Sequence, residues 1–129
     1  SMTTGGIMER HPKLRAAFLE GTAGWVYWWL WRLDDQWDKY GKGCEYQLRM
    51  PPSEYFKRQC YASVECDEFT AKYIPDFGYE DNIVFSTDYP HWQFDGDDPM
   101  PPAVPQSIRQ KIMVDNPLAT YARLGALVQ

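Results

Sequence analysis

Histidine is scarce in this sequence, because His11 and His91 are the only two among its 129 residues. A catalytic zinc ion usually has three protein ligands and one water, so a centre built mainly of histidines is excluded for this chain by itself. The three cysteines, Cys44, Cys60 and Cys66, form no C-x-x-C pair. Their odd number, without a secretory segment, predicts free thiols that are buried as small apolar side chains in a cytoplasmic protein.

An excess of basic residues and a long hydrophobic run are also missing. The net charge is -5, which argues against the basic patch that nucleic-acid binding requires. The longest apolar run, residues 25–31, is far shorter than the roughly 20 residues that span a membrane. The composition, 44% hydrophobic and 24% charged, predicts one globular domain over residues 1–129, with Ser1 and Met2 interpreted as a cloning remnant. Small molecules and proteins remain as partners.

Three short apolar runs are predicted to be β-strands, at residues 14–19, 60–64 and 83–85. An acidic residue follows each of them, namely Glu20, Glu65 and Asp88. Helical patterns lie between the runs, and this alternation is typical of βαβ units with a parallel sheet. Right-handed crossovers place the strands in sequence order, with their carboxyl ends at one edge. The three acids are therefore expected to line that edge as a polar or metal site.

The longest helix is predicted from an apolar stripe and ends at Gly41 and Gly43. The stripe recurs about every four residues and consists of Trp25, Trp29, Leu33, Trp37 and Tyr40. It is interpreted as core packing, whereas Trp28 and Trp31 lie off it and are expected to face a partner. Side-chain caps are predicted for three helices, by Thr22 for this one, by Ser53 for a short one, and by Asn116 for a last one that ends near Leu124.

The stretch NIVFSTDYPH, residues 82–91, carries the most chemistry. Asp88 follows a buried strand that Tyr89-Pro90 cannot continue, so Asp88 and His91 are placed at the carboxyl edge of the sheet, where α/β folds carry their sites. The residues alone leave two interpretations of Asp88, a site carboxylate or a cap of the turn before the proline. Glu65 is likewise a site residue or a solvated strand end. An exposed acidic, proline-rich loop is expected over residues 94–105.

Several strings carry a resemblance to a known family. They are GGIMERHPKLR, FLEGTAGWVYWWLWRLDD, PPSEYFKRQCYASVECDE and NIVFSTDYPH, followed by KIMVDNPLATYARL. The chain resembles the C-terminal part of the amidohydrolase-related family, which contains metal-dependent hydrolases and decarboxylases similar to aminocarboxymuconate-semialdehyde decarboxylase. The resemblance implies an α/β fold of about three βα units, with parallel strands and flanking helices, from the end of a TIM barrel. A complete barrel has about 250 residues.

The resemblance also implies roles for individual residues. Asp88, in the string STDYPH, matches an aspartate that binds the metal or is the base for metal-bound water, with zinc or manganese as the metal. Glu20 stands where the decarboxylases carry a histidine before Gly-Gly, and it is interpreted as a polar catalytic residue. His91, Glu65 and Trp25 are expected around these two as supporting or substrate-loop residues. The H-x-H pair of the first strand and the histidine of the middle strands are absent from the sequence.

Two functions follow from these observations. In the first, the chain is a fragment of a metal-dependent hydrolase or decarboxylase for a small molecule, and it is inactive alone because the H-x-H motif is missing. In the second, it is a catalytically silent, truncated domain that self-associates. Three parallel strands leave two sheet edges and apolar faces that so small a monomer covers poorly, so a homo-oligomer is expected in either case. Substrate and reaction type stay open.

Overall fold

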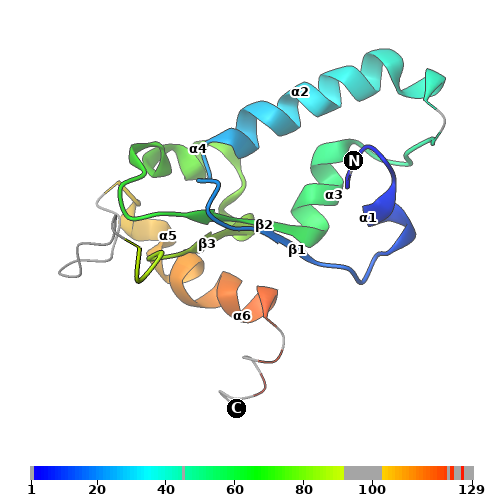
Figure 1. Cartoon of the computed structure of the whole chain (residues 1–129). Coiled ribbons are helices and arrows are strands. Elements are labelled where there is room, and N and C mark those ends of the chain that lie inside the picture. Colours follow the sequence, from blue (N-terminus) through cyan, green and yellow to red (C-terminus); the bar gives the residue numbers. More distant parts are fainter. Residues whose placement is uncertain (1, 45, 92–102, 122, 124–125, 127–129) are drawn as a thin grey trace.

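A parallel sheet of three strands forms the centre of the computed structural model, which describes residues 2–44, 46–91, 103–121, 123 and 126. The strands are β1 (Ala16–Phe18), β2 (Cys60–Val64) and β3 (Ile83–Phe85), and they lie in the order β1-β2-β3 (Figure 1). Their register pairs Phe18 with Ala62 and Val64 with Phe85. The predicted parallel sheet and its strand order are confirmed.

Helices precede, connect and follow the strands. They are α1 (Ile7–Arg10), α2 (Trp25–Tyr40), α3 (Pro52–Gln59), α4 (Ile74–Phe77), α5 (Gln106–Gln110) and α6 (Asn116–Thr120). Short 3-10 turns are η1 (Gly41–Gly43), η2 (Phe69–Tyr73) and η3 (Glu80–Asn82). Between the last two helices, η4 (Lys111–Asp115) is π-helical.

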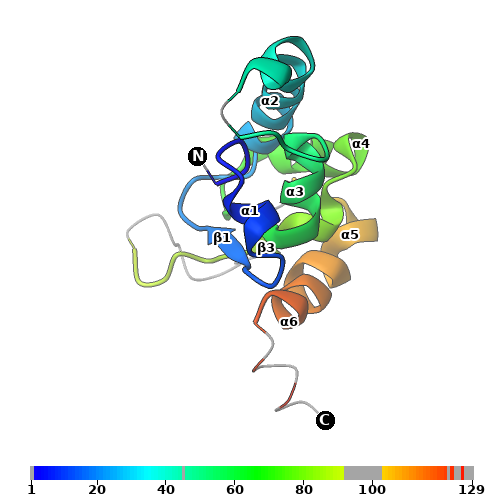
Figure 2. The same ribbon diagram turned by 90° about the vertical axis from the view of Figure 1, so that its right-hand side faces the viewer.

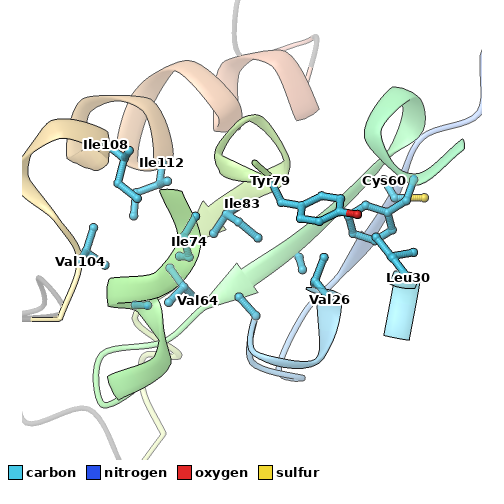
Figure 3. Packing of buried hydrophobic residues seen from close by; sticks show 14 of the residues in the cluster. Val26, Leu30, Cys60, Val64, Ile74, Tyr79, Ile83, Val104, Ile108 and Ile112 are labelled. Atoms are coloured by element: carbon cyan, nitrogen blue, oxygen red, sulfur yellow. The ribbon is translucent and has the colours of Figure 1, made fainter. Parts of the chain in front are cut away.

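Side chains of the sheet alternate between a face that packs on helices and the opposite face. The helix-facing residues Cys60, Ala62, Val64 and Ile83 are at most 1% exposed. They join one core with residues of α2 and of the C-terminal helices, including Val26, Leu30, Ile108 and Ile112 (Figure 3). Figure 2 shows α3, α4 and α5 gathered on one side of the strands. α3 and α4 belong to the two crossovers, and right-handed crossovers place them on the same side of the sheet. The alternate residues Ala17, Tyr61, Ser63 and Val84 lie outside this core.

The caps predicted from Thr22 and Ser53 are wrong, because carboxylates from distant parts of the chain take their place. The cap position of α2 is Gly24, whose backbone N–H donates to Glu68 Oε1 at 2.7 Å. At the start of α3, the backbone N–H of Ser53 donates to Asp34 Oδ1 at 2.9 Å. A carboxylate at a helix N-terminus satisfies free N–H groups and interacts favourably with the helix dipole. Local sequence spacing does not reveal a cap of this kind.

The third predicted cap, Asn116, is also wrong, because α6 continues directly from η4 and Asn116 is its first residue, without a side-chain cap bond. α5, η4 and α6 follow one another without a break, and the π-helical turn precedes Pro117, which has no N–H to donate to the previous turn. Asn116 is instead buried and donates through Nδ2 to the backbone oxygens of Glu80 and Ile83, both at 2.6 Å. Its amide ties the C-terminal helix to the start of β3.

The core-facing side of α2 differs from the predicted stripe. Val26 and Leu30 are its buried residues. Of the stripe, Trp25, Leu33 and Trp37 are partly buried, whereas Trp29 and Tyr40 are exposed. The difference arises because α2 extends beyond the short strands and packs mainly on α3 (Figure 1). Trp28 and Trp31 are exposed, as expected for residues off the core.

Other predictions are met in part. Cys60 is buried as expected, but Cys44 is exposed and Cys66 only partly buried. In the part of the chain that the structure describes, no helix has both the length and the apolar character needed to cross a membrane. Most of the expected loop, residues 94–102, and Leu124 lie outside the described residues.

Candidate functional site

Glu20, Glu65 and Asp88, here called the acidic rim, follow the ends of three neighbouring strands. Glu65 comes directly after β2, and Glu20 and Asp88 come shortly after β1 and β3. Because the strands are parallel and adjacent, these ends meet at one edge of the sheet. The structure thus brings the three acids to the edge where the sequence places them, while their roles stay predictions.

The carboxyl group of Glu65 is affected by the other acids of this edge. Burial raises its pKa above the ordinary value, and the negative charge of Asp88 raises it further, followed by those of Asp67, Glu68 and Glu20. A raised pKa means that the carboxyl keeps its proton to higher pH than a free glutamate. Such a group is suited to proton transfer closer to neutral pH.

The backbone of this edge contains the three non-glycine residues with positive φ among those described, Glu20 at 56°, Thr22 at 55° and Asp88 at 57°. The left-handed region costs a side-chain-bearing residue about 1–2 kcal/mol, and such outliers cluster at functional sites. Hydroxyl groups help to hold both acidic loops. The backbone N–H of Glu20 donates to Ser63 Oγ at 3.2 Å, and that of Asp88 donates to Ser86 Oγ at 3.3 Å.

Asp88 and His91 form a side-chain pair at this edge. His91 Nδ1 lies 3.1 Å from Asp88 Oδ2, and the Asp88 side chain is 20% exposed while that of His91 is 49% exposed. The backbone also closes a turn here, because the His91 N–H donates to the Asp88 carbonyl at 2.8 Å across a cis Tyr89–Pro90 bond. Asp88 therefore serves the turn through its backbone and presents its carboxylate to the imidazole, so the two interpretations of this residue are compatible.

Trp25 lies on the helix-facing side of the sheet, next to the loop that carries Glu20. Its ring meets Phe18 edge-on at 5.4 Å between centroids and Phe56 at 6.0 Å. A Cβ atom added to Gly21 would lie 3.6 Å from Trp25 Nε1. Trp25 thus packs against the core and contacts the loop that carries Glu20.

Sequence reasoning missed Glu68 and Ser63 as residues that organise this edge. Glu68 is 7% exposed, and its carboxylate accepts from the backbone N–H groups of Ala23 and Gly24 and from Thr70 Oγ1. These bonds anchor the end of the loop that begins at Glu20. One sequence feature could have pointed to Glu68. Gly24 has no side chain that could cap α2, so the first N–H groups of that helix need an acceptor from another part of the chain.

The family resemblance implies a divalent metal, which requires several donor side chains close together at this edge. Among the residues that the structure describes, no three His, Cys, Asp or Glu side chains come together in a group that could hold a metal ion. Asp88 and His91 offer a carboxylate and an imidazole, but a catalytic zinc usually takes three protein ligands. The described residues therefore do not form a complete metal site.

The sequence profile of a family described as Amidohydrolase matches residues 1–123. This chain belongs to the amidohydrolase family. Members of the family generally use divalent metals. A search of curated proteins finds no match to the chain.

Two solved structures of other proteins are similar in fold to this chain of the amidohydrolase family. The amidohydrolase map2389c from Mycobacterium avium subsp. paratuberculosis K-10 is 22% identical with a TM-score of 0.73, covering 92% of this chain and 30% of that one. The 5-carboxyvanillate decarboxylase LigW from Sphingomonas paucimobilis is 22% identical with a TM-score of 0.71, covering 94% of this chain and 37% of that one. The amidohydrolase-family chain thus has the fold of a fragment of these TIM-barrel proteins and spans only about a third of their length.

Proposed function

We propose that this chain contributes the C-terminal βα units of an amidohydrolase-type barrel, with Asp88 as the carboxylate that binds the metal or accepts a proton. The observation that carries the proposal is the position of Asp88 past the end of β3, partly exposed and paired with His91, in a chain that matches the family over residues 1–123. Active sites of such barrels lie at the carboxyl ends of the strands.

Each polar residue at this edge has its own role in the proposed site. His91 holds Asp88 Oδ2 at 3.1 Å, which orients the carboxylate and leaves Oδ1 for a metal or a proton. Zinc or manganese suits a donor set of carboxylate and imidazole. Glu65, whose pKa is raised by burial and by Asp88, is the carboxyl group best suited to hold a proton. Glu20 adds a third carboxylate, held in place by the bond from its N–H to Ser63.

The substrate is proposed to be a small molecule. One similar structure is named an amidohydrolase and the other a decarboxylase, so hydrolysis and non-oxidative decarboxylation are the two reaction classes. Both create negative charge near a reacting carbonyl or carboxylate, which a metal ion stabilises as a Lewis acid. The remaining metal donors are proposed to come from outside the described residues, because those residues supply no group of three.

The test uses the open reading frame that encodes this chain, extended upstream as far as it stays open. The extended protein is expected to hold zinc or manganese stoichiometrically by mass spectrometry of the metal content. Asp88→Asn is expected to lower metal affinity by at least the 10–100-fold that is typical of lost supporting contacts. Asp81→Asn is the matched control, because its exposed carboxylate pairs with Lys111 on the helical side of the molecule.

An extended protein without metal, or an Asp88→Asn variant that binds metal like the unmodified protein, would contradict the proposal. A second candidate function is a catalytically silent domain, favoured by the absence of a three-donor group among the described residues. It predicts that the frame does not extend upstream and that the chain binds neither zinc nor manganese.

A further inference from the structure

A cavity of about 210 Å³, here called the α2–α4 cavity, lies between the first turn of α2 and the segment formed by η2 and α4. Val26, Ile74 and Ile83 form its apolar floor, since they line it and are at most 7% exposed. All three belong to the core shown in Figure 3. Ala23 and Gly24 also line it and are too small to fill the space. The cavity is therefore a gap in the layer of helices that covers the sheet.

Three partly exposed aromatic rings form the mouth of the α2–α4 cavity. Tyr27, Tyr73 and Phe77 line it and are 44%, 43% and 38% exposed. Tyr27 stacks on Phe77 with 3.9 Å between ring centroids and an interplanar angle of 14°, and the Phe77 ring lies 6.4 Å from that of Tyr73. Aromatic rings prefer stacked or edge-to-face aromatic neighbours, and an apolar cavity of about 150 Å³ can hold one benzene molecule. The walls and the volume therefore suit a single aromatic ring.

The α2–α4 cavity also contains one polar group that can fix the orientation of a ligand. Among the described residues that line it, Glu68 is the one with a charged side chain, and it is 7% exposed. Its Oε1 accepts from the backbone N–H groups of Ala23 and Gly24 and from Thr70 Oγ1. One donor among the described residues, the N–H of Ala23 at 2.9 Å, reaches Oε2. Because a carboxylate oxygen has two lone pairs, Oε2 can accept a further hydrogen bond.

The surroundings of Glu68 favour a neutral donor. The carboxylate lies at the N-terminus of α2, where the helix dipole is positive and disfavours a second cation. Burying an ammonium group among apolar side chains also costs far more than burying a hydroxyl group that makes a hydrogen bond. An anion is repelled by the charge of Glu68 itself. Ligand sites of this kind combine apolar walls with a few polar groups that set the orientation of the ligand.

We propose that the α2–α4 cavity binds a small neutral aromatic molecule with one hydroxyl group, of the phenol class. The hydroxyl group donates to Glu68 Oε2, and the ring packs among Tyr27, Tyr73 and Phe77. This site is separate from Asp88, because it lies in the layer of helices and not past the end of β3.

Occupancy of the cavity is expected to affect the acidic rim indirectly. Glu68 holds the backbone N–H groups of Ala23 and Gly24, at the end of the loop that begins at Glu20. A ligand that binds the folded chain and not the unfolded chain stabilises the folded state. A phenol on Glu68 therefore stabilises the position of this loop together with the start of α2.

The experiment is a titration of the ¹⁵N-labelled 129-residue chain with phenol, without metal, followed by two-dimensional ¹H–¹⁵N NMR. The backbone N–H signals of Ala23, Gly24 and Thr70 are expected to shift until they saturate. Toluene has the same ring without the hydroxyl group and is expected to bind about tenfold more weakly, because it lacks the hydrogen bond to a charged acceptor. Benzoate is expected not to bind, because its charge would face Glu68.

Two variants separate the hydrogen bond from the apolar contacts. Glu68→Gln is expected to bind phenol and toluene equally, whereas the control Asp38→Asn, at an exposed carboxylate of α2, keeps the preference for phenol. Tyr73→Ala is expected to weaken both ligands by the same factor, because it removes one wall. Tyr40→Ala is its control, at a ring that is 65% exposed and outside the cavity. The comparison of ligands on the unmodified chain needs no variant and stays valid if Glu68→Gln does not fold.

Three results would overturn this inference. Equal affinities for phenol and toluene on the unmodified chain would exclude Glu68 as the acceptor, and so would a preference for phenol that persists in Glu68→Gln. Phenol-induced shifts that do not saturate, or that lie away from Ala23, Gly24 and Thr70, would exclude the site itself. The inference is independent of the proposed activity, because binding is measured without metal and Asp88 is not altered.

Discussion

The Glu68 carboxylate accepts a hydrogen bond of 2.7 Å from the backbone N–H of Gly24, 44 residues away in the sequence. Ala23 donates to the same carboxylate at 3.0 and 2.9 Å. Glu68 follows β2, whereas Gly24 stands at the start of α2, so these bonds join two consecutive loops at the carboxyl edge of the sheet. The arrangement stabilises the helix and holds the loop that presents Glu20.

Replacing Glu68 by alanine is expected to lower the free energy of unfolding by about 2–3 kcal/mol, because two N–H groups at a helix N-terminus lose their acceptor. Glu68→Gln keeps an acceptor oxygen but loses the charge that faces the helix dipole, so a loss of about 1 kcal/mol is expected. Urea unfolding followed by circular dichroism measures both effects. Asp38→Ala, at an exposed carboxylate of α2 outside its first turn, serves as control and should change little. Equal urea midpoints for Glu68→Ala and the control would show that the cap contributes nothing.

Asn116→Ala is expected to destabilise the chain by about 2 kcal/mol. The substitution leaves the buried carbonyl of Ile83 and the partly buried carbonyl of Glu80 without their donor from the Asn116 amide. Thermal unfolding by circular dichroism measures the loss as a lower melting temperature. Gln106→Ala, on the same helical segment but exposed, is the comparison. An Asn116→Ala melting temperature within error of that comparison would contradict the structural role of this amide.

The free energy of unfolding is expected to depend on pH through Glu65. Its pKa is raised above the ordinary 4.5 in the folded chain, first by burial and then by the charge of Asp88. The folded state therefore binds this proton more tightly than the unfolded state. The stability that Glu65 contributes is fully present below the unfolded pKa and is lost as pH rises through the folded pKa.

Glu65→Gln removes this dependence, so the variant should be more stable than the unmodified chain at neutral pH and lose that advantage near pH 4.5. Urea midpoints at the two pH values give the comparison, and Glu54→Gln is the control for loss of an exposed carboxylate. A Glu65→Gln variant that is less stable at neutral pH would reverse the sign and show that the ionised carboxylate is favourable in the fold.

The sequence predicts the sheet well because its signals are local. The β-branched and aromatic run at residues 83–85 is the observed β3, and residues 60–64 are the observed β2. Alternation with helices and the right-handed crossover rule are then sufficient for the strand order. The same reasoning places Glu20, Glu65 and Asp88 at one edge, and the family match over residues 1–123 agrees with the resemblance that the sequence carries.

The helix ends were not predictable in the same way. Thr22, Ser53 and Asn116 are residue types that favour caps, yet distant carboxylates cap two of the helices, and α6 continues from η4 without a free N-terminus for Asn116 to cap. A carboxylate 44 residues away produces no sequence pattern near the helix that it caps. Only the folded chain decides which groups meet there.

The sequence by itself determines the parallel α/β arrangement, the family and the position of Asp88 past the last strand, because strand propensity and βα alternation act over a few residues. The tertiary structure alone decides that His91 pairs with Asp88, that Glu68 holds the loop of Glu20, and that aromatic rings from α2 and α4 join in one exposed patch. These relationships depend on distances between segments that are far apart in the chain, and packing sets those distances.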